Sequence, residues 1–120
     1  MIFLLGGPPR VGKSIISSAI RQKHGVSVVS TDTLGAVLEA VLSPAAAPDL
    51  FVFGKFNELP MAERVDLIMK DPAQLINFVR MESHVVWKAA EEYIRREYYE
   101  GRDVLIEGVA VLPELMSQLE

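Results

Sequence analysis

The amino-acid sequence predicts an α/β fold with a parallel sheet. Three short apolar segments, residues 2–5, 26–29 and 103–108, have the composition of buried strands, and segments with helical spacing of apolar residues lie between them. A strand, a helix and a second strand within about 30 residues form a β-α-β unit, whose strands run parallel. We expect residues 1–120 to form a single domain, because this length leaves little room for two cores.

The first β-α-β unit takes up the start of the chain. Residues 2–5 are uniformly apolar and end at two glycines and two prolines, which interrupt a strand. Residues 14–24 place apolar side chains on one side of a helix, and Gly25 supplies a natural stop for it. Residues 26–29 are mostly valine and predict the second strand. Residues 33–42 have the spacing of another helix.

The middle of the chain is less regular. Pro44, Pro48, Gly54 and Pro60 interrupt residues 43–60, so we expect a long loop there. Such a loop is either a lid or binding loop, or a hydrophobic plug whose three phenylalanines cover the core; we favour the plug slightly. Residues 61–69 predict a short helix.

A long helix, or two helices end to end, is predicted between Asp71 and Gly101. Asp71 offers an N-cap, Pro72 stands at the first helical position, and Gly101 closes the segment. Its inward positions are predicted at Leu75, Val79, Val86, Ala90 and Tyr93. The charged residues 91–97 predict a solvated face. Residues 103–108 form the third strand, and a last helix begins at Leu112.

Composition excludes several classes of function. The formal net charge of −4 removes the usual electrostatic case for binding nucleic acid or an anionic membrane. The absence of cysteine excludes disulfides, thiolate nucleophiles and cysteine-ligated zinc. No run approaches the about 18 apolar residues of a membrane span, and the start lacks the basic region of a signal peptide. We therefore expect a soluble, cytoplasmic protein.

A glycine-rich segment between the first strand and the first helix carries the strongest motif. It matches the phosphate-binding pattern G-x-x-x-x-G-K-[S/T] at every fixed position, through Gly7, Pro8, Pro9, Arg10, Val11, Gly12, Lys13 and Ser14. Backbone N–H groups of such a loop surround phosphate oxygens, and the following helix adds its N-terminal dipole. Lys13 is expected to reach the β- and γ-phosphates, and the Ser14 hydroxyl to ligate Mg²⁺. Pro8 and Pro9 lack an N–H, so residues 10–14 must supply part of the cradle.

This segment predicts a nucleotide site with Mg²⁺. The alternative is an ordinary turn from strand to helix, capped by Ser14. Arg10 is either a phosphate contact or an exposed loop residue.

Two carboxylates follow or end the other strands. Asp32 comes directly after the second strand, and Glu107 ends the third. Because ligands of parallel α/β sheets bind beyond the carboxyl ends of the strands, we expect both on the rim that holds the phosphate segment. One would orient or deprotonate an acceptor hydroxyl, and the other would hold Mg²⁺. The alternatives are a helix N-cap for Asp32 and a pairing with a neighbouring cation for Glu107.

At these residues the chain resembles the P-loop small-molecule kinases, and most closely the 2-phosphoglycerate kinases. The matching stretches are GGPPRVGKS, STDTLGAVLEAV and VLIEGVAVLP, the last after a helix ending EEYIRREYYEG. Chloramphenicol phosphotransferase and zeta-toxin-like kinases share the layout more distantly. The resemblance implies a three-layer α/β/α P-loop fold and transfer of the γ-phosphoryl group of Mg-ATP to a hydroxyl of a small molecule, for which 2-phosphoglycerate is a candidate. The catalytic residues are then Lys13, Asp32 and Glu107, with Asp32 as base or substrate ligand and Glu107 as a contact for Mg²⁺ or substrate.

The chain departs from the family pattern at two positions. The family tends to carry an arginine where this chain has Gly35, and often a histidine where it has Ala110. These departures leave the acceptor open. Arg80 and His84 on the long helix are candidates to replace the missing side chains, or else a surface arginine and a half-buried histidine.

The resemblance also implies strands beyond the three found here. Kinases of this layout have a sheet of order 2-3-1-4-5 and a lid with arginines, so we expect a sheet truncated to about three strands, with residues 2–5 as an exposed apolar edge. The chain is then a fragment, or a second copy covers the edge in a homodimer. The functional alternative to a kinase is a nucleotide-binding module that binds ATP without turnover.

Overall fold

The computed structural model describes residues 1–7 and 12–117, which form three parallel strands and the helices around them. The strands are β1 (Ile2–Gly6), β2 (Ser27–Ser30) and β3 (Val104–Gly108). β3 lies in the centre and pairs in parallel with β1 on one side and β2 on the other. The structure thus confirms the α/β class and the parallel sheet, with the neighbour order 2-3-1 that the resemblance implies.

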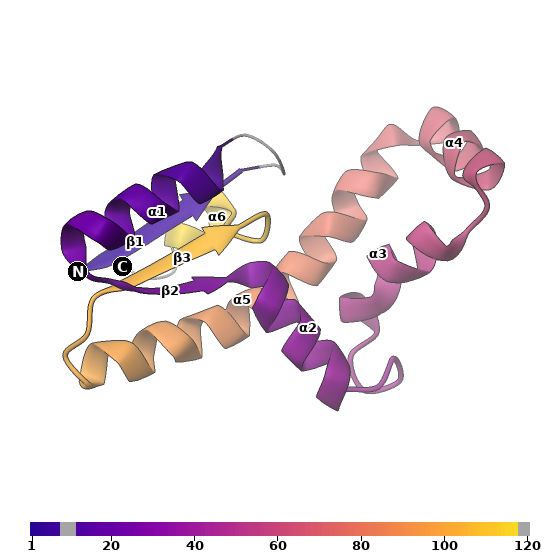
Figure 1. Cartoon of the computed structure of the whole chain (residues 1–120). Coiled ribbons are helices and arrows are strands. Elements are labelled where there is room, and N and C mark those ends of the chain that lie inside the picture. Colours follow the sequence, from indigo (N-terminus) through magenta and orange to yellow (C-terminus); the bar gives the residue numbers. More distant parts are fainter. Residues whose placement is uncertain (8–11, 118–120) are drawn as a thin grey trace.

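The helices lie on both sides of this sheet. They are α1 (Lys13–His24), α2 (Thr31–Val41), α3 (Pro48–Glu58), α4 (Met61–Lys70), α5 (Pro72–Tyr99) and α6 (Pro113–Met116). Figure 1 shows the sheet between α1 and the C-terminal half of α5, while α3, α4 and the N-terminal half of α5 extend away from it. In the described part of the chain, no helix combines the length and apolar composition needed to cross a membrane.

The main core lies between β3 and α5. Val104 and Ile106 of β3 are fully buried and pack in one cluster with Trp87, Ala90 and Ile94 of α5. The sequence predicted the buried positions Val86 and Ala90, whereas Trp87 and Ile94 complete the inward face. A central strand with apolar side chains on both faces explains why residues 104–106 are a continuous apolar run.

The opposite side of the sheet is less covered. α1 packs against the strands, yet it buries none of its residues, and Ile15 is 79% exposed. β1 lies at the edge of the described sheet, with Ile2 41% exposed. The expected apolar edge is therefore present, and the expectation from composition that β1 is buried on both faces is not met.

The prediction of an irregular stretch over residues 43–60 was wrong, because most of it is the helix α3. Pro48 occupies a position in the first turn, where its missing N–H costs no helical hydrogen bond, and Gly54 lies within the helix on its exposed side. The ring of Phe56 packs on Phe78 of α5, with ring centroids 5.9 Å apart. Leu50 is fully buried. This packing agrees with the hydrophobic plug rather than with an open lid.

The long segment after Asp71 is one continuous helix rather than two. α5 runs over 28 residues, and Asp71 occupies its N-cap position without a capping hydrogen bond from its side chain. The predicted solvated face is confirmed, since Glu92 forms ion pairs with both Arg95 and Arg96 on the exposed side. Gly101, with φ of 73°, turns the chain toward β3.

Candidate functional site

The three predicted site segments follow or end parallel strands at the same edge of the sheet. Gly6, at the end of β1, is in register with Gly108, and Ser30, at the end of β2, is in register with Glu107. The phosphate segment continues from Gly6, and Asp32 comes two residues after Ser30. The parallel topology therefore brings the phosphate segment, Asp32 and Glu107 to one rim, as in other open α/β sheets.

The phosphate segment is described at its two ends. Pro8, Pro9, Arg10 and Val11, which were predicted to contact phosphate, lie outside the described residues. Gly7 and Gly12 both have positive φ, 138° and 93°, a backbone conformation that glycine adopts without strain. Gly12 is the N-cap of α1, so Lys13 and Ser14 stand in the first turn of that helix.

The Lys13 side chain contacts the residue at the start of this segment. Its Nζ donates a hydrogen bond to the carbonyl oxygen of Gly7 at 2.8 Å, which closes the loop across six residues. The ammonium group is therefore held at the N-terminus of α1, where helical N–H groups and the dipole favour an anion. Ser14 is exposed in the same turn.

Asp32 lies in the first turn of α2 and is not its N-cap. The N-cap is Ser30, whose hydroxyl accepts a hydrogen bond from the Asp32 N–H at 3.1 Å. The alternative assignment of Asp32 as a helix cap was therefore wrong. Because Ser30 performs the capping, the Asp32 carboxylate stays exposed and lines a pocket.

Glu107 faces the other side of the sheet. Side chains alternate along a strand, and Val104 and Ile106 point toward α5, so Glu107 points toward the side that α1 covers. Glu107 is half-buried, and it forms no salt bridge with another described residue. The alternative of a pairing with a neighbouring cation therefore finds no support among the described residues. A carboxylate here and the Ser14 hydroxyl are oxygen donors of the kind Mg²⁺ takes in phosphoryl-transfer sites, where phosphate and water complete the shell. The donor types thus fit Mg²⁺.

A close contact ties the ends of β2 and β3 together. The Thr31 hydroxyl is buried and accepts a hydrogen bond from the Ala110 N–H at 3.4 Å. A Cβ on Gly108 would lie 1.9 Å from that hydroxyl oxygen, and Gly108 has φ of 143°. Glycine is required here so that the segment after β3 can approach the start of α2. This approach sets the position of Asp32 relative to the end of β3.

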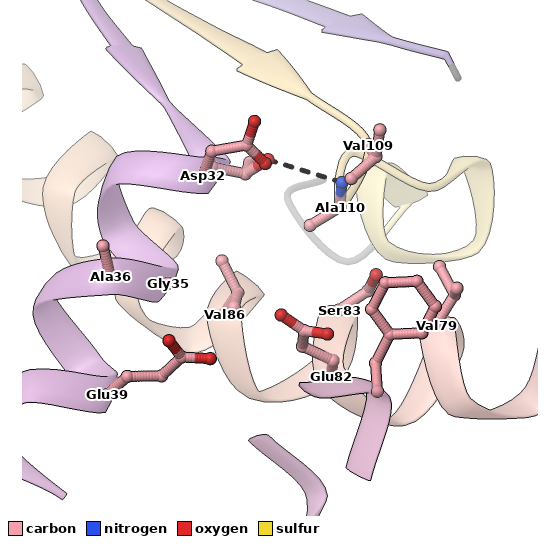
Figure 2. A pocket seen from close by; sticks show the side chains of 12 residues that line it. Asp32, Gly35, Ala36, Glu39, Val79, Glu82, Ser83, Val86, Val109 and Ala110 are labelled. Atoms are coloured by element: carbon pink, nitrogen blue, oxygen red, sulfur yellow. Dashed lines mark hydrogen bonds between the residues drawn. The ribbon is translucent and has the colours of Figure 1, made fainter. Parts of the chain in front are cut away.

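The pocket beside Asp32 has a volume of about 320 Å³ and lies between α2, α3, α5 and the turn after β3. Its lining residues are Thr31, Asp32, Gly35, Ala36, Glu39, Phe53, Val79, Glu82, Ser83, Val86, Val109 and Ala110. Figure 2 shows Asp32 at one end of the pocket, with Glu39 and Glu82 extending toward one another. Glu107 does not line it.

The sequence analysis missed Glu39, Glu82 and Ser83. The spacing of Asp32, Gly35 and Glu39 could have revealed one of them, because residues three, four and seven apart share a helix face. Nothing in the sequence places α5 opposite that face. Burial, together with the negative charges of Glu39 and then Asp32, raises the pKa of the Glu82 carboxyl above its ordinary value.

Arg80 and His84 do not line this pocket. They lie on a neighbouring face of α5, where Arg80 Nε is 3.6 Å and His84 Nε2 is 3.5 Å from Glu114 Oε1 of α6. They therefore do not supply basic groups beside Asp32, and the exposure of both side chains agrees with the alternative, in which they are surface residues. Gly35 and Ala110 line the pocket without any charge.

Comparison with known proteins finds the same family of kinases that the motifs resemble. The chain is 36% identical to a 2-phosphoglycerate kinase of Thermococcus kodakarensis over 98% of its own length, and 30% identical to one of Pyrococcus furiosus over 94%. A 2-phosphoglycerate kinase of Methanocaldococcus jannaschii is 29% identical over 98%. The matched regions cover 36–39% of these relatives, so the chain spans less than two-fifths of their length.

No family model and no solved structure matches the chain. The sequence relationship therefore rests on the curated relatives, which come from several archaea and carry one name. Over nearly all of its residues, the chain is related to a part of the 2-phosphoglycerate kinases, which confirms the resemblance that its motifs predicted.

Proposed function

We propose that this chain carries the phosphate-binding part and the catalytic base of an ATP-dependent kinase that phosphorylates a hydroxyl group of a small molecule. The observation that carries the proposal is the joint position of the phosphate segment, Asp32 and Glu107 at the carboxyl edge of one parallel sheet. The names of the relatives support the kinase class. They make 2-phosphoglycerate the first acceptor to test.

Each residue has a separate task in this proposal. Lys13 holds the β- and γ-phosphates at the N-terminus of α1 and neutralises charge that develops during transfer. Asp32 takes the proton from the acceptor hydroxyl, whose oxygen forms a bond to the γ-phosphorus while the bond to ADP breaks. Ser14 and Glu107 would hold Mg²⁺, which would neutralise charge on the phosphate oxygens.

The position of the carboxylates supports this division. Asp32 lines a pocket large enough for a small acceptor, whereas Glu107 points to the side of the sheet covered by α1, whose N-terminus follows the phosphate segment. A base belongs on the acceptor side, and a ligand of Mg²⁺ belongs on the nucleotide side.

Phosphoryl transfer from ATP to 2-phosphoglycerate, measured by release of ADP, tests the proposal. Asp32→Asn is expected to retain Mg-ATP binding and to lower turnover by about 10²-fold or more, because it removes general-base catalysis. A variant that loses both ATP binding and turnover would overturn the assignment of Asp32 as base. Glu58→Gln, on the exposed end of α3, is the matched control and should change neither quantity.

The competing function is a nucleotide-binding module without turnover. It requires the same phosphate segment but no acceptor. ATP binding that is lost in Lys13→Ala, combined with no ADP release for any acceptor tested, would favour the module.

A further inference from the structure

A second cavity lies between α3, α5 and the short helix α6. It has a volume of about 310 Å³ and is bordered by Asp49 of α3, Leu115 of α6 and several residues of α5. This cavity and the pocket beside Asp32 share no lining residue. A ligand of the second cavity therefore does not compete for space with the acceptor of the proposed kinase.

Trp87 borders this cavity and carries a buried hydrogen-bond donor without a partner. It is 1% exposed, and its indole Nε1 donates to no acceptor atom in the described part of the chain. Buried donors are almost always hydrogen-bonded, because an unpaired N–H has lost its bonds to water. The indole N–H therefore points to an acceptor atom that a ligand brings. Because Nε1 itself exposes almost no surface, neighbouring side chains must shift to admit that atom, and His84 and Lys88 on the cavity wall are exposed enough to do so.

Charged groups of both signs line the cavity beside this donor. Lys88 supplies an ammonium group, and Asp49 and Glu91 supply carboxylates. None of these three side chains forms a salt bridge with another residue in the ranges that the structure describes, whereas His84, which also borders the cavity, lies 3.5 Å from Glu114. A simple anion would meet two carboxylates, and a simple cation would meet the ammonium group. A ligand with one charge of each sign therefore suits the cavity better than either.

Val85 and Leu115 give the same cavity an apolar wall. We propose that it binds a free α-amino acid with an apolar side chain. The carboxylate of the ligand accepts hydrogen bonds from the Trp87 indole and the Lys88 ammonium group, and charge-assisted bonds of this kind are the stronger ones in proteins. Its ammonium group lies toward the two carboxylates, and its side chain contacts the apolar wall. A volume of about 310 Å³ is at the lower end for small-molecule sites, as a ligand of this size requires.

Three probes with the same branched side chain separate the two charges. They are leucine, which carries both, isocaproate, which lacks the ammonium group, and isoamylamine, which lacks the carboxylate. Each is titrated into the full 120-residue chain without nucleotide. Trp87 is the only tryptophan of the chain, so its fluorescence and the NMR signal of its indole N–H report on this cavity. We expect leucine to bind about tenfold more tightly than either analogue and to shift the indole N–H signal.

Charge variants test the two ends of the ligand separately. Lys88→Gln should weaken binding of leucine and isocaproate by about threefold to tenfold and leave isoamylamine unchanged. The double variant Asp49→Asn and Glu91→Gln should weaken leucine and isoamylamine by a similar factor and should not weaken isocaproate. Lys23→Gln, at an exposed position of α1, removes one charge outside the cavity and should change none of the three affinities.

Trp87→Phe keeps a buried ring and removes the donor. We expect the variant to bind leucine about tenfold or more weakly in calorimetry, because it cannot donate to the carboxylate, and circular dichroism checks that it folds. Wild-type affinity of the folded variant would overturn the proposal. So would a leucine titration that leaves the indole signal of the wild type unchanged, or an analogue that binds as tightly as leucine. If Trp87→Phe does not fold, the indole signal and the Lys88→Gln series decide between these outcomes.

Discussion

Replacing Gly108 by alanine tests how closely the segment after β3 approaches α2. The added Cβ would lie 1.9 Å from the Thr31 hydroxyl oxygen, and the backbone φ of 143° is one that residues with a side chain seldom adopt. The backbone strain costs about 1 to 3 kcal/mol. Overpacking at a buried position adds about 1 to 3 kcal/mol. We therefore expect Gly108→Ala to lower the free energy of unfolding by about 2 to 6 kcal/mol, a large share of the stability of a small domain.

Urea unfolding followed by circular dichroism measures this change, and two other glycines supply controls. Gly101 has φ of 73° and open space around its Cβ position, so Gly101→Ala should cost only the strain, about 1 to 2 kcal/mol. Gly54 lies in α3 with nothing within 4 Å, so Gly54→Ala should be neutral or stabilise the helix by about 0.5 to 1 kcal/mol.

The clash itself is isolated by a double variant. Thr31→Ala removes the hydroxyl that the new Cβ would meet, so Gly108→Ala should cost less in that background than in the wild type. If Gly108→Ala is no more destabilising than Gly101→Ala, the close approach of β3 and α2 is refuted. The geometry that positions Asp32 would then need revision.

Three further predictions concern charge, burial and the sheet edge. Glu82→Gln should raise the free energy of unfolding at pH values above the raised pKa of Glu82, because the ionised form destabilises the fold as pH rises through that pKa. The gain should vanish below about pH 3, where the carboxyl is protonated in both the folded and the unfolded state. Thermal unfolding across this range checks it, and a gain that does not change with pH would contradict it. Trp87 is 1% exposed, and its indole N–H has no hydrogen-bond partner within the described part of the chain. Trp87→Ala should therefore lower the free energy of unfolding by about 3 to 5 kcal/mol, and Trp87→Phe by far less, because phenylalanine keeps most of the buried ring and loses no hydrogen bond. Urea unfolding measures both changes, and equal losses would refute this. If a second copy covers β1, Ile2→Lys should weaken self-association in sedimentation experiments, and unchanged association would rule out that edge as the contact.

Much of the fold could be predicted because local patterns and global packing agree. Residues 104–106 are a continuous apolar run because β3 is central and buried on both faces. Gly25 marks the end of α1 because its φ of 64° suits the residue after a helix. In these segments the sequence alone determines the element, and the structure confirms it.

The helix α3 could not be predicted, because its sequence contains the residues that usually break helices. Pro48 is tolerated at the start, Gly54 on an exposed side, and the helix is stabilised by Leu50 and Phe56, which are buried in the tertiary structure. Periodicity in the segment alone does not reveal what α5 offers for packing. Tertiary contacts therefore override local preference here.

The candidate site, too, could be predicted only in part from the sequence. The rim position of Asp32 and Glu107 followed from the parallel topology, which the strand and helix patterns predicted. The pocket charge did not follow, because Glu82 and Ser83 come from α5, about 50 residues after Asp32 in the sequence. Only the packing of α5 against α2 brings them beside Asp32.

A calorimetric titration of Mg-ATP into the 120-residue chain, with Lys13→Ala as the comparison, tests the central claim most directly. The account predicts saturable binding that the variant loses, because Lys13 supplies the cation that meets the phosphates at the N-terminus of α1. Absence of binding in a folded sample, or equal binding by Lys13→Ala, would contradict a working phosphate site in this chain.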